Sequence, residues 1–215
     1  MPDLRSILLE LLVPSVCPAC DRSRAEGETL LCPSCSQGLV PLSRHRRALT
    51  TVAYEGAAAD LIRRLKFEGR RDGLPVLVRL LTARVSGLRF DGIVPVPRHW
   101  ERIRGEGCDP AFDLARGLSR TTGRPLWWRS LVRARRARPQ VELALADRRR
   151  NLVGAFRASE SGARGRVVLL VDDVSTSGAT LQEAARELRR GGARRGLRLA
   201  VAGTRDLPRP RQPAL

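Results

Sequence analysis

The sequence has almost no lysine, almost no asparagine and no long apolar run. Lys66 is the single lysine, so 39 of the 40 basic residues (40 − 1) are arginine, and Asn151 is the single asparagine. No stretch approaches the roughly 18 uninterrupted apolar residues that a transmembrane helix requires. The N-terminal MPDLRSILLELLV places Asp3, Arg5 and Glu10 within its apolar run, which argues against a signal peptide and predicts a short amphipathic helix. These absences predict a cytoplasmic protein without a membrane span.

Acidic residues are also scarce relative to basic ones. The chain has 40 basic and 22 acidic residues, and its net charge is +18. An excess of this size favours a polyanionic partner, either nucleic acid or a highly phosphorylated ligand. The alternative is a generic basic surface produced by compositional bias towards arginine. Because the bias against lysine is so strong, the surviving Lys66 suggests a compact point charge with a specific role.

Two C-x-x-C motifs lie near the N-terminus, CPAC and CPSC, with eleven residues between them. This spacing predicts one structural zinc ion held by four thiolates, namely Cys17, Cys20, Cys32 and Cys35. The alternative is a pair of disulfides, which the missing signal peptide disfavours. A zinc ion with four protein ligands folds its segment and does not catalyse. Cys108 lies outside the pattern and is expected to be a free thiol.

The length and composition divide the chain into three parts. With 215 residues it can form one medium-sized domain and a small appendage. We expect an N-terminal helix and zinc ribbon at residues 1–45 and a larger α/β domain at 46–205. The proline-rich segment 206–215 is expected to be a disordered tail.

The stretch VVLLVDDVSTSGAT, residues 167–180, carries the strongest functional signal. Val167–Val171 predicts a strand that is buried on both faces, followed by Asp172 and Asp173. A Ser/Thr/Gly loop then leads into a helix whose apolar face is Leu181, Ala184, Ala185 and Leu188, and which ends near Gly191.

Such a helix N-terminus can bind a phosphate group through backbone N–H groups. The two carboxylates suit ribose hydroxyls or a magnesium-bound ligand. The lack of a Walker lysine and the lone Gly178 exclude a P-loop and a dinucleotide fingerprint. The alternative is a structural turn with a Ser/Thr N-cap and two solvated acids.

The rest of the chain predicts further strands and helices around this unit. We expect strands at 50–54, 91–96, 126–128, 155–156 and 197–203, and helices at 57–67, 74–81 and 109–120. The arginine-rich segment 133–150 is interpreted as a mobile excursion and a candidate lid. The prolines after strand 91–96 make a rigid loop that suits a pyrophosphate group, with candidate contacts at Arg98, His99 and Arg104.

A second basic stretch, residues 124–138, has six arginines and two tryptophans in fifteen positions. Arginines interleaved with aromatic residues suit single-stranded nucleic acid, which offers charged phosphates and stackable bases. The alternative is that the tryptophans belong to a strand, with at least one of them in the core. The candidate contacts are Arg124, Trp127, Trp128, Arg129, Arg133, Arg135, Arg136 and Arg138.

The order of residues in 167–180 resembles the 5-phosphoribosyl-1-pyrophosphate (PRPP) motif of type I phosphoribosyltransferases. The resemblance implies that Asp172 and Asp173 hold the ribose hydroxyls of PRPP, which binds with magnesium. It also implies a phosphate cradle made of Ser175, Thr176, Ser177, Gly178, Ala179 and Thr180. Lys66 is a further candidate for a phosphate oxygen on the pyrophosphate side.

The set of motifs CPAC, CPSC, LKFEG, VPVPRHWERIRG, RARRARPQ, RRRNLVGAF and VDDVSTSGAT resembles the ComF family of competence-associated proteins (ComFC and GntX types). The resemblance implies a zinc ribbon followed by a type I phosphoribosyltransferase domain, with a mostly parallel sheet flanked by helices. It also implies a role in DNA uptake during natural transformation, or in the use of external DNA. The alternatives are an active phosphoribosyltransferase of nucleotide metabolism and a non-catalytic adaptor that docks a competence helicase.

The chain departs from the family pattern on one side of the expected pocket. RGEGCDPAF, residues 104–112, stands where an RGFNQ-like stretch is usual, and RARRARPQ lacks the usual threonine. The phosphate loop keeps its hydroxyl residues, with STSGAT in place of a TTGAT ending. The ligand loop is therefore intact and the acceptor side is altered, which supports binding of PRPP more firmly than turnover.

Overall fold

A four-stranded parallel sheet forms the centre of the protein. The structure is a computed structural model, and it describes residues 16–24, 30–42, 48–98, 108–134, 152–159 and 162–204. The strand order is β1-β6-β5-β2, and every neighbouring pair is parallel. The strands are β1 (Leu49–Ala53), β6 (Arg195–Gly203), β5 (Val167–Ser175) and β2 (Gly92–Pro95).

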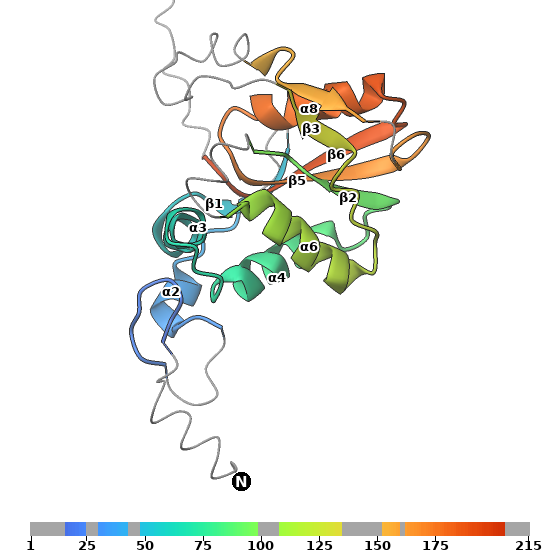
Figure 1. The fold of residues 1–215 in the computed structure, drawn as a ribbon. Coiled ribbons are helices and arrows are strands. Elements are labelled where there is room, and N and C mark those ends of the chain that lie inside the picture. Colours follow the sequence, from blue (N-terminus) through green and yellow to red (C-terminus); the bar gives the residue numbers. More distant parts are fainter. Residues whose placement is uncertain are drawn as a thin grey trace, which may run out of the picture.

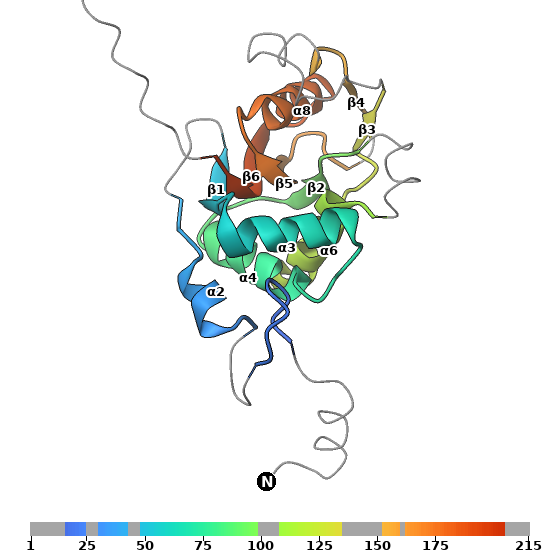
Figure 2. The same cartoon turned by 90° about the vertical axis from the view of Figure 1, so that its left-hand side faces the viewer.

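Helices cover both faces of this sheet (Figures 1 and 2). Three helices lie on one face: α3 (Gly56–Phe67), α4 (Leu74–Val85) and α6 (Pro110–Thr122). The other face is covered by α8 (Ala179–Arg190) and by an antiparallel hairpin of β3 (Leu131–Arg133) and β4 (Phe156–Ala158). No described helix is long and apolar enough to cross a membrane.

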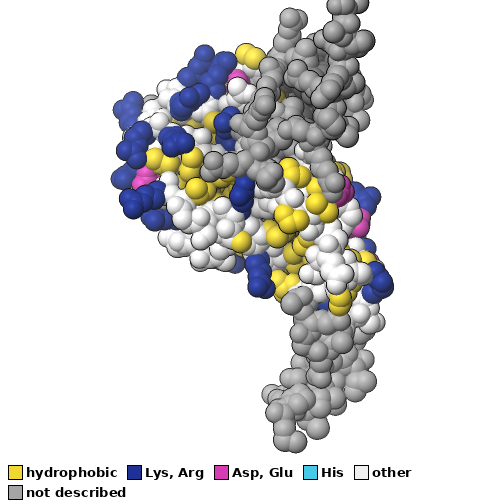
Figure 3. Space-filling view, turned by 180° about the vertical axis from the view of Figure 1, so that it is seen from behind, with side chains coloured by type: hydrophobic (Ala, Val, Ile, Leu, Met, Phe, Trp, Pro, Cys, Tyr) yellow, Lys and Arg dark blue, Asp and Glu magenta, His cyan; other side chains and the backbone are white. Residues whose placement is uncertain are grey.

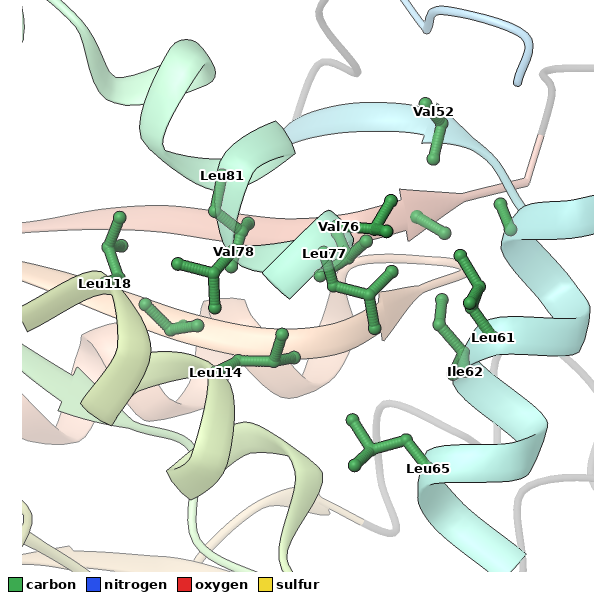
Figure 4. Packing of buried hydrophobic residues seen from close by; sticks show 14 of the residues in the cluster. Val52, Leu61, Ile62, Leu65, Val76, Leu77, Val78, Leu81, Leu114 and Leu118 are labelled. Atoms are coloured by element: carbon green, nitrogen blue, oxygen red, sulfur yellow. The ribbon is translucent and has the colours of Figure 1, made fainter. Parts of the chain in front are cut away.

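Each face of the sheet has its own apolar core. Leu61 and Ile62 of α3, Leu77 of α4 and Leu114 of α6 meet the sheet on one face (Figure 4). On the other face, α8 presents the stripe predicted from its spacing, and this stripe packs on Val168, Leu170 and Ala200. Because β5 is flanked by β6 and β2 and covered on both faces, its first five residues are all buried.

Most predicted elements are present, with shifts at their ends. The helix expected at 74–81 continues to Val85, and α8 ends at Arg190 with Gly191 as its C-cap. The strand expected at 167–171 runs on to Ser175, because Asp172, Val174 and Ser175 still pair with β6. The two acids therefore lie within the last part of β5 rather than beyond it.

The strand expected at 126–128 is wrong. Leu126 forms only an isolated bridge with Ile93, and the chain then turns before β3 begins at Leu131. The backbone of Trp127 donates to the carbonyl of Ile93, after which Ser130 N–H bonds the Trp127 carbonyl and closes the turn. The expected N-terminal helix, segment 135–151 and the tail at 206–215 lie outside the described residues.

The cysteine-rich segment packs directly on α3 and α4. It contains the short helix α2 (Pro33–Gln37), and Cys17 and Cys32 share one apolar cluster with Leu61 and Leu77. Asp21, in the turn after CPAC, forms ion pairs with Arg64 at 2.6 Å and Arg70 at 2.7 Å. The hydrogen bonds from Arg64 and Arg70 lower the pKa of Asp21 to about 2.

Candidate functional site

The turn from β5 into α8 forms a hollow lined by backbone and hydroxyl groups. Gly178 is the N-cap of α8, and its φ of 71° lies in the left-handed region that favours glycine. Gly178 supplies no side chain to cap the helix, and the Ala179 N–H donates to the preceding Ser177 Oγ at 3.4 Å. The hollow has a volume of about 230 Å³ and is lined by Asp172, Val174, Ser175, Thr176, Ser177, Gly178, Ala179, Thr180 and Leu181.

Ser175 provides a second sign of a ligand in this hollow. The residue is only 4% exposed, and among the described residues its hydroxyl oxygen has no hydrogen-bond partner. Buried hydroxyls almost always have a partner, because an unpaired one costs free energy. The unpaired Oγ of Ser175 beside a helix N-terminus fits an oxyanion that would accept from both.

The paired acids of β5 are held in different electrostatic environments. Lys66 Nζ lies 3.1 Å from Oδ2 of Asp173, which is 8% exposed, and the Val174 N–H donates to Oδ1 at 2.8 Å. Burial alone would raise the pKa of Asp173, but the charge and hydrogen bond of Lys66 hold that pKa below its ordinary value. Burial and the nearby charge of Asp173 raise the pKa of Asp172 well above its ordinary value.

Lys66 reaches this position because the end of α3 is fastened to the start of α6. Cys108, a buried free thiol as expected, donates its S–H to the carbonyls of Leu65 at 3.0 Å and Lys66 at 3.3 Å. Arg98 in turn donates to the Cys108 carbonyl at 3.4 Å. Lys66 and Arg98, both expected on the pyrophosphate side, are thus linked through Cys108. His99 and Arg104 lie outside the described residues.

Asp109 interacts with the charges of Arg98 and Asp173, a role that was not predicted from the sequence. Its side chain caps α6 by accepting from the Phe112 N–H at 3.2 Å. Burial raises its pKa, the charge of Arg98 opposes this, and the charge of Asp173 adds to it. The sequence did show where this helix begins, because Asp109 followed by Pro110 is the pattern of an N-cap and a first helical residue. Nothing local showed that this cap would face Asp173.

The two tryptophans have different environments. Trp127 is half-buried and packs against the apolar core on the α8 face of the sheet. Its ring also packs closely on Gly92, because a Cβ added to that glycine would be 2.6 Å from the ring. Trp128 is 49% exposed. Its ring meets Phe112 edge-on, with centroids 6.4 Å apart, and the Arg129 guanidinium lies 4.5 Å from its centroid.

The other nucleic-acid candidates are only partly described. Arg124 lies over Phe90 and Arg133 over Phe156, with guanidinium-to-centroid distances of 5.9 Å and 5.2 Å. Like Arg129 on Trp128, these arginines lie over aromatic rings of the protein itself. The remaining candidates lie outside the described residues, namely Arg135, Arg136 and Arg138.

The four predicted cysteine ligands converge on one point. Their sulfur atoms all lie within 4.8 Å of one another, and Cys20 and Cys32 Sγ are 3.7 Å apart. A tetrahedral zinc site with Zn–S bonds of about 2.3 Å requires S···S distances of about 3.8 Å. The disulfide alternative is wrong, because all of the cysteines are free. Arg22 Nε also donates to Cys20 Sγ at 3.4 Å, as a supporting contact to a metal-bound thiolate would. The cysteines are therefore positioned to bind a metal ion.

Comparison with known proteins agrees with this geometry. Residues 113–206 match the family described as phosphoribosyl transferase domain. The chain is 34% identical to DNA utilization protein YhgH of Escherichia coli K12 over 202 residues, covering 83% of this chain and 86% of that protein. It is 35% identical to Competence protein F of Haemophilus influenzae over 141 residues, covering 61% and 62% of the two chains.

Among solved structures, it is similar to a glutamine PRPP amidotransferase from B. subtilis complexed with ADP and GMP. The TM-score is 0.44 and the identity 21%, over 64% of this chain and 30% of that one. The family assignment rests on the sequence relatives and the domain match. The parallel sheet with its covering helices is thus a type I phosphoribosyltransferase fold preceded by a four-cysteine segment, and the chain belongs to the ComF family, together with YhgH and Competence protein F.

Proposed function

We propose that this protein binds PRPP with magnesium and acts in the uptake or use of external DNA. The role in DNA use rests on its relatives, whose names are DNA utilization protein and competence protein. The PRPP site rests on one observation above others. The buried, unpaired hydroxyl of Ser175 lies beside a helix N-terminus whose N-cap residue is glycine and near two adjacent carboxylates, inside a phosphoribosyl transferase domain.

In the proposed complex, the loop of residues 175–180 surrounds the 5′-phosphate. The N–H groups at the start of α8 and the hydroxyls of Ser175, Thr176 and Thr180 donate to its oxygens. Asp172 and Asp173 accept from the ribose 2′- and 3′-hydroxyls. The ion pair with Lys66 keeps Asp173 ionised, which is the state that accepts hydrogen bonds most strongly.

The pyrophosphate lies towards Lys66 and Arg98 in this arrangement, with His99 and Arg104 as further proposed contacts. Magnesium, when bound with PRPP, neutralises pyrophosphate charge and takes oxygen ligands of the carboxylate type. If pyrophosphate departs, positive charge develops at ribose C1, and the carboxylates of Asp172 and Asp173 stabilise it. Because the segment 104–112 departs from the family pattern, we propose ligand binding as the principal activity and turnover as the property to be tested.

The metal at the four cysteines is proposed to be structural zinc. The donor set is four thiol sulfurs within 4.8 Å of one another, and four protein ligands leave no open position for a substrate. Single-stranded DNA is the proposed macromolecular partner. The exposed ring of Trp128 with the adjacent Arg129 supports this, because an unpaired base can stack on the ring while the arginine meets a phosphate.

Calorimetry with PRPP and magnesium tests the ligand proposal. The variant Asp172→Ala/Asp173→Ala is expected to weaken PRPP binding by about 100-fold or more, since each hydrogen bond to a charged group contributes roughly 1.5–3 kcal/mol. A matched control is Asp60→Ala/Asp72→Ala, which removes two exposed acids elsewhere and should bind as the wild type does. Absence of binding heat in the wild-type protein would contradict the proposal.

An uptake assay with the same variants separates ligand-dependent roles from a purely adaptor role. If cells carrying Asp172→Ala/Asp173→Ala take up DNA normally, the pocket is dispensable and docking of a competence helicase becomes the better explanation. If uptake falls with PRPP binding, the pocket acts in the process. Pyrophosphate release with candidate acceptors then distinguishes turnover from binding.

A further inference from the structure

Two segments and one helix end bring six arginines to the edge of the sheet where β5 and β6 begin. Segments 164–166 and 192–195 run side by side, because Gly165 N–H bonds the Gly192 carbonyl at 2.8 Å and Arg194 N–H bonds the Arg166 carbonyl at 2.9 Å. The last turn of α8 ends beside them. We name this the arginine surface, made of Arg164, Arg166, Arg189, Arg190, Arg194 and Arg195, all exposed. Figure 3 shows basic side chains gathered over this part of the molecule.

The arginine surface lacks the acidic partners that arginines have elsewhere. Within the described residues, only Arg190 contacts a carboxylate, that of Glu187 at 3.0 Å. On the opposite face of the sheet, Asp21 pairs with both Arg64 and Arg70. The helix dipole favours basic residues in the last turn of α8, but it does not account for the four arginines outside that helix. The surface therefore has a concentrated positive charge that the described acidic residues leave largely unpaired.

The arginine surface also continues towards the exposed tryptophan. Gly191, at the end of α8, lies against β4, since a Cβ on it would be 2.5 Å from Cβ of Ala158. Ser159, the residue after Ala158, donates its N–H to the Ser130 carbonyl at 3.0 Å, and its hydroxyl donates to the Arg129 carbonyl. The end of α8 is thus connected through the end of β4 to the backbone of Arg129, the residue after Trp128.

We infer that single-stranded DNA lies along this surface, with its phosphates on the arginine surface and a base stacked on Trp128. A single strand fits better than a duplex, because only an unpaired base exposes a face for stacking on the ring. The inference rests on the role in DNA use proposed above and adds where the strand binds.

The arginine surface is separate from the PRPP loop. The arginine surface is at the start of β5 and the loop is at its end, and a strand of nine residues spans about 30 Å. Substitutions on the arginine surface therefore leave the PRPP loop intact, and substitutions in the loop leave the arginine surface intact.

Fluorescence anisotropy with labelled oligothymidylate tests the inference. An oligonucleotide of about 20 nucleotides exceeds the roughly 4–16 nucleotides that one such domain covers. The variant Arg164→Gln/Arg166→Gln/Arg194→Gln should bind at least tenfold more weakly. The slope of log K against log salt should become shallower by about 0.7 for each phosphate that the variant no longer neutralises. Trp128→Ala should weaken binding by roughly 1–3 kcal/mol, or about 5- to 150-fold, without changing the slope.

The matched control is Arg63→Gln/Arg79→Gln/Arg120→Gln, which removes three exposed arginines from α3, α4 and α6 on the opposite face. It should bind DNA as the wild type does. Equal weakening of DNA binding in both triple variants, or unchanged DNA binding in the first, would overturn the arginine surface as the DNA site. Tighter binding of a duplex of equal length would overturn the assignment of a single strand.

PRPP calorimetry on the same proteins keeps the two proposals apart. A missing PRPP signal in the wild type refutes the ligand proposal alone, and unchanged DNA binding in the first triple variant refutes the arginine surface alone.

Discussion

Asp172 and Asp173 are neighbours in one strand, yet their pKa values shift in opposite directions. Lys66 stabilises the charge of Asp173, whereas burial and the charge of Asp173 disfavour the charge of Asp172. Lys66 Nζ lies 3.1 Å from Oδ2 of Asp173, whereas Asp172 lines the hollow at the start of α8. Without a bound ligand, ionised Asp172 therefore costs the fold stability, as is common for residues retained for binding.

The substitution Asp172→Asn is expected to stabilise the free protein at neutral pH. A carboxyl whose folded-state pKa is raised costs no stability below its unfolded pKa of about 3.9, and the cost grows as pH rises to the folded pKa. The increase in unfolding free energy should fall within the roughly 0.5–3 kcal/mol typical of single substitutions, and it should vanish near pH 4. Thermal unfolding at both pH values measures it.

The exposed residue Asp60 provides the comparison for this test. Asp60→Asn removes a carboxylate from an exposed ion pair and should change stability little at either pH. A variant at Asp172 that is no more stable than the wild type at pH 7 would show that the carboxyl ionises there without cost. Asp173 behaves oppositely, since its lowered pKa contributes stability above its unfolded pKa that is lost as pH falls through the folded value.

At the scale of the elements, the phosphate loop depends on one backbone conformation. Gly178 connects β5 to α8 with φ near 71°, where a side chain with a Cβ is disfavoured. Gly178 has no side chain that could accept from the helix, and the hydroxyl of Ser177 accepts from the Ala179 N–H at 3.4 Å. The structural alternative of a Ser/Thr N-cap is thus met only in part, because glycine is the N-cap residue and the serine precedes it.

Gly178→Ala should destabilise the fold by about 1–2 kcal/mol and also weaken PRPP binding, because the left-handed residue shapes the loop. Gly87→Ala is a matched control. Gly87 has φ of 78° with open space around it, so alanine there has the same backbone cost at a distance from the loop. Urea denaturation should give similar losses for both variants, and calorimetry should show a weaker PRPP signal only for Gly178→Ala. Equal PRPP binding by the two variants would rule out a role for this turn in the ligand site.

At the scale of the whole molecule, the metal segment and the α/β domain share one core. Cys17 and Cys32 belong to the same apolar cluster as Leu61 and Leu77, and Asp21 adds ion pairs to α3. Loss of the metal should therefore loosen the packing on α3, from which Lys66 reaches Asp173. The four-cysteine segment thus packs with the helix that carries Lys66, although the two lie in different parts of the chain.

Chelation of the metal is expected to lower the Tm of the whole chain in a single transition, because no separate core remains to melt independently. Elemental analysis should find zinc in the purified protein and in a Cys108→Ser control, but not in Cys32→Ser. Circular dichroism follows the unfolding. Two well-separated transitions after chelation, with the second at the original Tm, would show that the metal segment folds alone.

Features that depend on neighbouring residues could be predicted from the amino-acid sequence. The spacing of CPAC and CPSC, the run from Val167 to Thr180 and the stripe of α8 each depend on the geometry of one turn, strand or helix. These patterns predicted the convergence of the four cysteines, the buried strand and the turn into α8, because local backbone periodicity places their side chains. They failed at Leu126–Trp128, where tertiary packing of Trp127 overrode the β-propensity of a short apolar run.

Which distant residues meet depends on the tertiary structure. Lys66 and Asp173 are 107 positions apart, and their contact depends on how α3 packs beside β5. Asp109 faces the same acids because α6 begins at that edge of the sheet, and the arginine surface exists because two loops pair at the opposite edge. Such contacts are set by the packing of whole elements, which spacing along the chain does not encode.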